Sequence, residues 1–60
     1  MKAVDVEEHA RRLREVHGNK AVAEAAHKAA ELEKAGRTEE ARDWRQIEKA
    51  LLQMRGPGES

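Results

Sequence analysis

The side chains of this chain that could bind a metal or act in acid-base chemistry include a Glu-x-x-His pair, Glu24 and His27. Two such pairs on facing helices, together with further glutamates, hold di-iron centres in helical bundles, and a symmetric dimer would supply the second pair. On a helical wheel, however, Glu24 and His27 lie about 120° to 180° from the apolar residues of their own segment. We therefore interpret them as part of a solvated face and expect neither a metal nor another cofactor.

Two further histidines, His9 and His17, flank Leu13 near the apolar side of the first helical pattern. Because histidine changes its charge between about pH 5 and 8, they could make an interface sensitive to pH. They could also be boundary residues, with His17 favoured by a helix C-terminus. The pattern favours this second interpretation and leaves the first open.

Basic residues gather in two short clusters, and contact between these clusters and nucleic acid is one alternative function. Twelve Lys+Arg balance twelve Asp+Glu, however, whereas a nucleic-acid-binding domain usually carries a basic excess. Interleaved glutamates are typical of ordinary solvated faces. A small nucleic-acid-associated regulator that uses Arg11–Arg14 therefore stays the alternative to a protein-binding module. The clusters are Arg11, Arg12 and Arg14, and Arg42, Arg45 and Lys49.

Enzyme chemistry has few candidate residues in this chain. Cys and Tyr are absent, Ser60 is the only serine, and no Gly-rich loop follows a predicted strand. We therefore expect a non-enzymatic protein. The lack of cysteine is compatible with a reducing compartment, and no long apolar run predicts a signal peptide or a membrane span. A cytoplasmic protein that does not bind membranes is the simplest interpretation.

Helices must position these side chains, because helix-forming residues dominate the composition and apolar residues recur at steps of three and four. We predict an all-α fold in which a short N-terminal helix precedes an antiparallel helical hairpin. The predicted helices span about 5–17, 20–35 and 39–55. Together they form one domain over residues 1–55, followed by a disordered tail at 56–60.

Turn and cap residues mark the ends of these helices. In one straight helix, the apolar residues before and after Gly18 would centre about 140° apart, so we expect a break there, with Asn19 capping the second helix. An oligomer could still use both faces of one continuous helix. Asp5 is the predicted cap of the first helix, Gly36 the left-handed end of the second, and Thr38 the cap of the third. The short link at Gly36 makes the second and third helices antiparallel.

The third segment carries most of the bulky apolar side chains, including the only aromatic residue, Trp44. Its apolar residues form a stripe along one side of the predicted helix and face mostly alanine on the second segment. Alanine lets the two helices approach closely, but its small side chain cannot cover so large an apolar stripe. In a chain of 60 residues, apolar burial and chain entropy nearly cancel, so we expect a dimeric helical bundle. Trp44 could instead be an exposed anchor for another protein. The candidate dimer interface comprises Leu13, Val16, Leu32, Trp44, Ile47, Leu51 and Met54.

Part of the hairpin resembles a single tetratricopeptide repeat, at Ala29, Leu32, Gly36, Glu40 and Ala41. Arg45 and Glu48 depart from that pattern, and the chain is too short for the three repeats of a stable array. The resemblance therefore implies a shared way of building a helical hairpin.

A longer pattern is similar to a group of short proteobacterial proteins of unknown function. It runs through His17-Gly18-Asn19-Lys20-Ala21, Glu33-x-x-Gly36, Asp43-Trp44-Arg45-x-Ile47 and Met54-Arg55-Gly56-Pro57. This resemblance implies a bacterial cytoplasmic protein and no particular activity. Taken with the composition, it leads us to expect a self-associating interaction or regulatory module with an unidentified protein partner.

Overall fold

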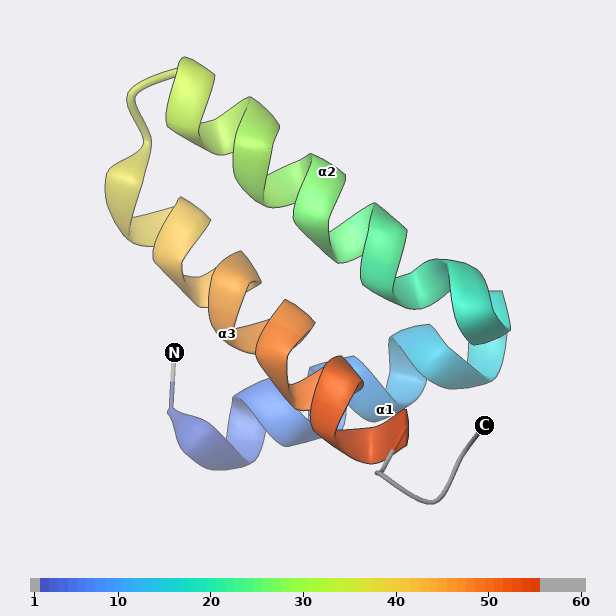
Figure 1. Cartoon of the computed structure of the whole chain (residues 1–60). Helices are drawn as coiled ribbons and strands as arrows, with labels where there is room; N and C mark the ends of the chain where they lie inside the picture. The colour runs from blue at the N-terminus through green and yellow to red at the C-terminus, as the bar shows by residue number, and fades with distance from the viewer. Residues whose placement is uncertain (1, 56–60) are drawn as a thin grey trace.

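Three α-helices and two short turns make up residues 2–55, which are the residues that the computed structural model describes (Figure 1). The helices are α1 (Ala3–His17), α2 (Ala21–Lys34) and α3 (Thr38–Arg55), with a 3₁₀ turn, η1, at Gly18–Lys20. This part of the chain contains no strand. The all-α class and the antiparallel hairpin of α2 and α3 are confirmed. The tail predicted at 56–60 lies outside the described residues.

Gly36 ends α2 and turns the chain into α3. Its φ of 79° is one that residues with a side chain rarely adopt. The N–H of Arg37 donates to the carbonyl of Leu32 at 2.9 Å, and the N–H of Gly36 donates to that of Glu33 at 3.1 Å. These two bonds define a Schellman motif, which satisfies carbonyls that the helix end would otherwise leave unpaired. The left-handed end predicted at Gly36 is confirmed.

Replacing Gly36 with alanine should lower the free energy of unfolding by about 1 kcal/mol, because an L residue in the left-handed region is strained. A Cβ at this position would meet no atom within 4 Å, so the loss would come from the backbone alone. Gly36→Asn is the matched control and should lose less, since asparagine tolerates this region. Urea denaturation followed by circular dichroism measures both, and equal losses would contradict the argument.

The predicted break at Gly18 is also confirmed. Gly18 has φ 60° and ψ −132°, and its N–H donates to the carbonyl of Arg14. Asn19, in contrast, lies inside η1 and does not cap α2. Lys20 occupies the N-cap position and makes no side-chain capping bond. The cap prediction is wrong because the turn adds a 3₁₀ bond from the Ala21 N–H to the Gly18 carbonyl, which moves the start of α2 beyond Asn19.

Two other helix starts differ from the predictions. α1 begins at Ala3 with Lys2 at the N-cap, so Asp5 lies in the first turn and is not the cap. α3 begins at Thr38 itself, and the carbonyl of the preceding Arg37 accepts the bond from the Ala41 N–H at 3.0 Å. An acidic side chain stabilises any position in a first turn, so Asp5 did not identify the residue at which α1 begins.

α1 packs across the end of the hairpin that holds the start of α2 and the end of α3 (Figure 1). The prediction that α3 has mostly alanine to cover its stripe is therefore incomplete, because α1 adds a second covering helix within the same chain. The far end of the hairpin, around Gly36, extends beyond α1. The buried cluster combines Val6 and Ala10 of α1, Ala21 and Ala25 of α2, and Ile47 and Leu51 of α3.

Candidate interaction surface

The seven residues predicted for a dimer interface separate into three groups. Ile47, Leu51 and Leu32 are buried within the single chain, at 0%, 1% and 8% exposure. A second group, Leu13, Trp44 and Met54, is half-buried and packs against the central cluster. Val16 is 75% exposed. A second copy packed on this folded chain could therefore touch the half-buried group and Val16, but not the fully buried residues.

Trp44 lies at the junction of α3 and α1. Its ring meets that of His9 edge-on, with 5.1 Å between centroids and an interplanar angle of 64°. This geometry is favourable for an aromatic pair, since the positive edge of one ring faces the electron-rich face of the other. His9 is thus a packing residue of the α1–α3 contact, in agreement with the boundary interpretation of the sequence.

Two large apolar side chains outside the predicted interface are exposed among the residues whose burial is described. Val4 is 71% exposed on α1 and Leu52 is 48% exposed on α3. Val4 was missed because the first helix was predicted to begin only at residue 5. Leu52 follows the buried Leu51 and is turned about 100° from it on the helix, which is the signal that could have identified it as exposed.

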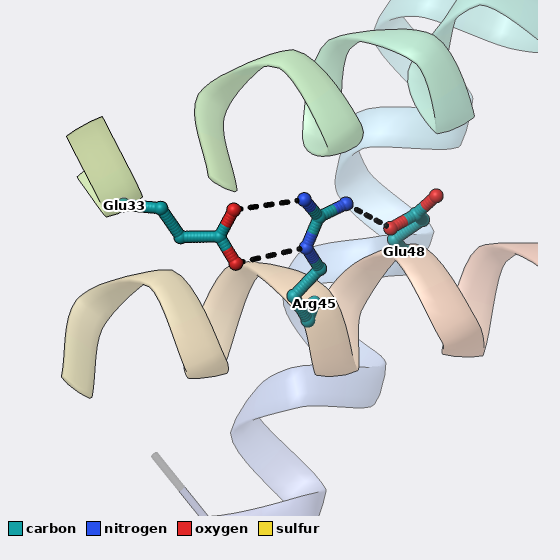
Figure 2. Close-up of polar contacts among 3 residues, drawn as sticks. All are labelled: Glu33, Arg45 and Glu48. Carbon is teal, nitrogen blue, oxygen red and sulfur yellow. Dashed lines mark hydrogen bonds and ion pairs between the residues drawn. The ribbon is translucent and has the colours of Figure 1, made fainter. Parts of the chain in front are cut away.

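Arg45 of α3 links the two helices of the hairpin through exposed polar contacts (Figure 2). Its Nη2 and Nε donate to the two carboxylate oxygens of Glu33 on α2, at 3.1 and 3.5 Å. Its Nη1 donates to Glu48, one turn further along α3, at 3.1 Å. The hydrogen bonds that Arg45 donates, first to Glu33 and then to Glu48, raise its pKa above the ordinary value. The guanidinium group therefore keeps its charge throughout the accessible pH range, and loss of its own proton would remove these ion pairs only in extreme alkali.

Arg45→Gln should cause a small loss of thermal stability that shrinks at about 1 M salt, because these ion pairs are exposed and screened. Arg42→Gln, at an exposed position on the same helix outside this network, is the control. Thermal unfolding of both variants at low and high salt checks the prediction. A loss of stability that does not depend on salt would contradict it.

The Glu-x-x-His pair does not converge in the structure. Nδ1 of His17 lies 3.0 Å from a carboxylate oxygen of Glu24, across the turn between α1 and α2. Nε2 of His27 lies 3.6 Å from Glu31 on its own helix. Among residues 2–55, no three acidic, histidine or cysteine side chains gather as a metal site would require. These histidine and glutamate side chains instead make separate local contacts on the outer side of α2.

The three arginines of the first basic cluster, Arg11, Arg12 and Arg14, lie in different surroundings. Arg14 is half-buried, and its Nη1 donates to the main-chain carbonyl of Met54 at 2.9 Å, which ties α1 to the end of α3. Arg11 and Arg12 are exposed, and Arg12 lies beside the acidic residues Asp5 and Glu8. The cluster therefore does not form one uninterrupted basic surface.

No protein-family model, curated protein or solved structure matches this chain. None of the helices described is long and apolar enough to cross a membrane.

Proposed function

We propose that the protein is a non-enzymatic helical module that self-associates, as a dimer, and presents a charged exterior to a protein partner. The observation that carries the proposal is the size of the core. Ile47 and Leu51 are the largest of the fully buried side chains described, and much of the remaining core is alanine. In a 60-residue chain, so little apolar burial barely offsets the entropy lost on folding. Association with a second copy would bury further apolar surface.

The exterior supports a protein partner in preference to a nucleic acid. The chain has no net charge, and basic and acidic side chains lie next to each other on its surface, as Arg45 does with Glu33 and Glu48. Without a basic excess, the release of counterions from a nucleic acid would supply little affinity. The absence of cysteine suits the reducing cytoplasm, where we place the protein.

Light scattering on a size-exclusion column tests self-association over a micromolar range of concentrations. We expect a mass that rises from that of one chain toward that of two. Val16→Ser should shift this equilibrium toward the single chain, because Val16 is the most exposed large apolar side chain among the described residues. Glu15→Ser, at the neighbouring exposed position, is the matched control. A folded chain whose mass stays that of a monomer throughout would refute the proposal.

Titration with duplex DNA at two salt concentrations tests the alternative function. We expect no binding even at low salt. Binding that weakens steeply with salt, and that is lost when Arg11 and Arg12 are replaced by glutamine, would instead support a nucleic-acid-associated regulator.

A further inference from the structure

The turn between α1 and α2 has the features of a hinge. Gly18, Asn19 and Lys20 are all exposed, and none of the three is buried against another element. Gly18, at φ 60° and ψ −132°, occupies a backbone region that residues with a side chain rarely adopt. The turn therefore depends on one residue and has no packing of its own.

α1 is held by α3 more than by α2, although α2 follows it in the chain. Val6 and Ala10 join Ile47 and Leu51 in the buried cluster, and Arg14 donates to the carbonyl of Met54. From α2, only the small residues Ala21 and Ala25 enter this cluster, and the polar contact is that of His17 with Glu24, whose side chains are 38% and 47% exposed. The contacts that fix α1 are therefore ones that the hairpin of any copy could provide.

A helical conformation at Gly18 would join α1 and α2 into one continuous helix. The 15 residues of α1 and the three of η1 would then extend about 27 Å beyond the start of α2, which is also the end of the hairpin where α3 finishes. The apolar face of α1 would point about 140° away from that of α2. In this form α1 cannot reach its own α3, and both Ile47 and Leu51 lose the part of their cover that α1 provides.

From this geometry, and given the self-association proposed above, we propose that α1 exchanges between two copies of the chain, with Gly18 as the hinge. Each α1 then covers Ile47 and Leu51 of the other copy. The exchanged dimer keeps the α1–α3 and α2–α3 contacts of the single chain and removes the special backbone conformation at Gly18.

Exchange also accounts for the exposure of Val16, the last apolar residue before the hinge, which is 75% exposed in the single chain. In the continuous helix Val16 and Ala23 are seven residues apart and fall on one face. In the exchanged dimer, the continuous α1–α2 helices of the two copies pass each other at the hinge. There the face that carries Val16 and Ala23 on one helix can pack on the other helix. The exchanged dimer therefore buries apolar surface that the single chain leaves in water.

Cysteine pairs and a short bismaleimide crosslinker can locate α1. Glu7 of α1 and Gln46 of α3 line one shallow hollow between these helices. We expect a mixture of Glu7→Cys chains and Gln46→Cys chains to give heterodimeric crosslinks at concentrations where the dimer is populated. Glu33→Cys and Arg45→Cys chains, which probe the hairpin, should give none, because α2 and α3 stay in one chain.

The two pairs separate exchange from other forms of association. A dimer by light scattering without crosslinks between Glu7→Cys and Gln46→Cys chains would refute exchange and leave self-association standing. Crosslinks for both pairs would move the hinge to the Gly36 turn and would equally refute the assignment to Gly18. A protein that stays monomeric would refute self-association itself, and exchange with it.

Gly18→Ala tests the hinge directly. A Cβ at this position meets no atom within 4 Å, so the substitution strains the turn without causing a clash and favours the helical form. We expect at least a tenfold decrease in the dissociation constant of the dimer and more crosslinking of the Glu7→Cys and Gln46→Cys pair. Circular dichroism confirms that the variant is folded, and the crosslinks of the Glu7→Cys and Gln46→Cys pair with Gly18 unchanged provide an independent readout. A folded variant with unchanged or weaker dimerisation would refute the hinge.

Discussion

Ile47→Ala should remove about 2 to 5 kcal/mol from the free energy of unfolding, the range for truncating a large aliphatic side chain in a core. Ile47 is 0% exposed and belongs to the cluster in which all three helices meet. A domain of this size has a total stability of about 3 to 9 kcal/mol, so the loss would be a large part of it. Urea denaturation followed by circular dichroism at 222 nm would measure the change.

Two further substitutions show whether the loss comes from the cavity. Ile47→Val removes one methylene group and should cost about 1 kcal/mol. Gln46→Ala changes the neighbouring, exposed residue on the same helix and should be nearly neutral. If Ile47→Ala cost no more than Gln46→Ala, the centre of the core would not lie where the three helices meet.

The helices and the hairpin were predictable because their signals are local. Ala41, Trp44, Ile47 and Leu51 recur at steps of three and four on α3. Trp44 is half-buried and the other three are buried, as that spacing predicts. Gly36 breaks the pattern where a left-handed residue is needed, and its φ is 79°. Periodicity and backbone sterics act within a few residues, so one sequence suffices to recognise them.

The packing of α1 was less predictable, because a wheel gives the direction of an apolar face and not the helix that covers it. Val6 and Ala10 were recognisable as a buried face, yet nothing in their spacing indicated α3 as their neighbour. The turn at Gly18 sets the angle of α1, and the conformation of a glycine can vary widely. For the same reason the sequence could not decide whether Ile47 and Leu51 are covered within one chain or between two.

The polar contacts between helices could not be predicted from the sequence, because the chain has so many charged residues. With 40% of the residues charged, many pairings of opposite charge are possible for Arg45, and sequence spacing recommends only those within one helix. The Glu48 contact is of that kind, whereas the Glu33 contact depends on the register of α2 against α3. The bond from Arg14 to the Met54 carbonyl, 40 residues away, likewise depends on where α1 crosses α3.

Trp44→Ala should weaken folding and self-association together. Trp44 is half-buried, so the loss of unfolding free energy should be about 1 to 3 kcal/mol, below the 3 to 5 kcal/mol of a fully buried tryptophan. The substitution removes the edge contact with His9, which helps to seat α1 on α3. If α1 exchanges between copies, that same contact joins the two chains, and the dissociation constant of the dimer should increase as well.

Denaturation and light scattering on the same samples separate the roles that Trp44 can have. Trp44→Phe keeps an aromatic ring for His9 and should restore most of both losses, whereas Trp44→Leu restores only apolar bulk. A residue that packs α1 on α3 changes stability, and in the exchanged dimer it changes association too. An anchor for another protein changes neither, so intact folding and assembly with loss of a bound partner would assign Trp44 to the outer surface and remove it from the α1–α3 contact.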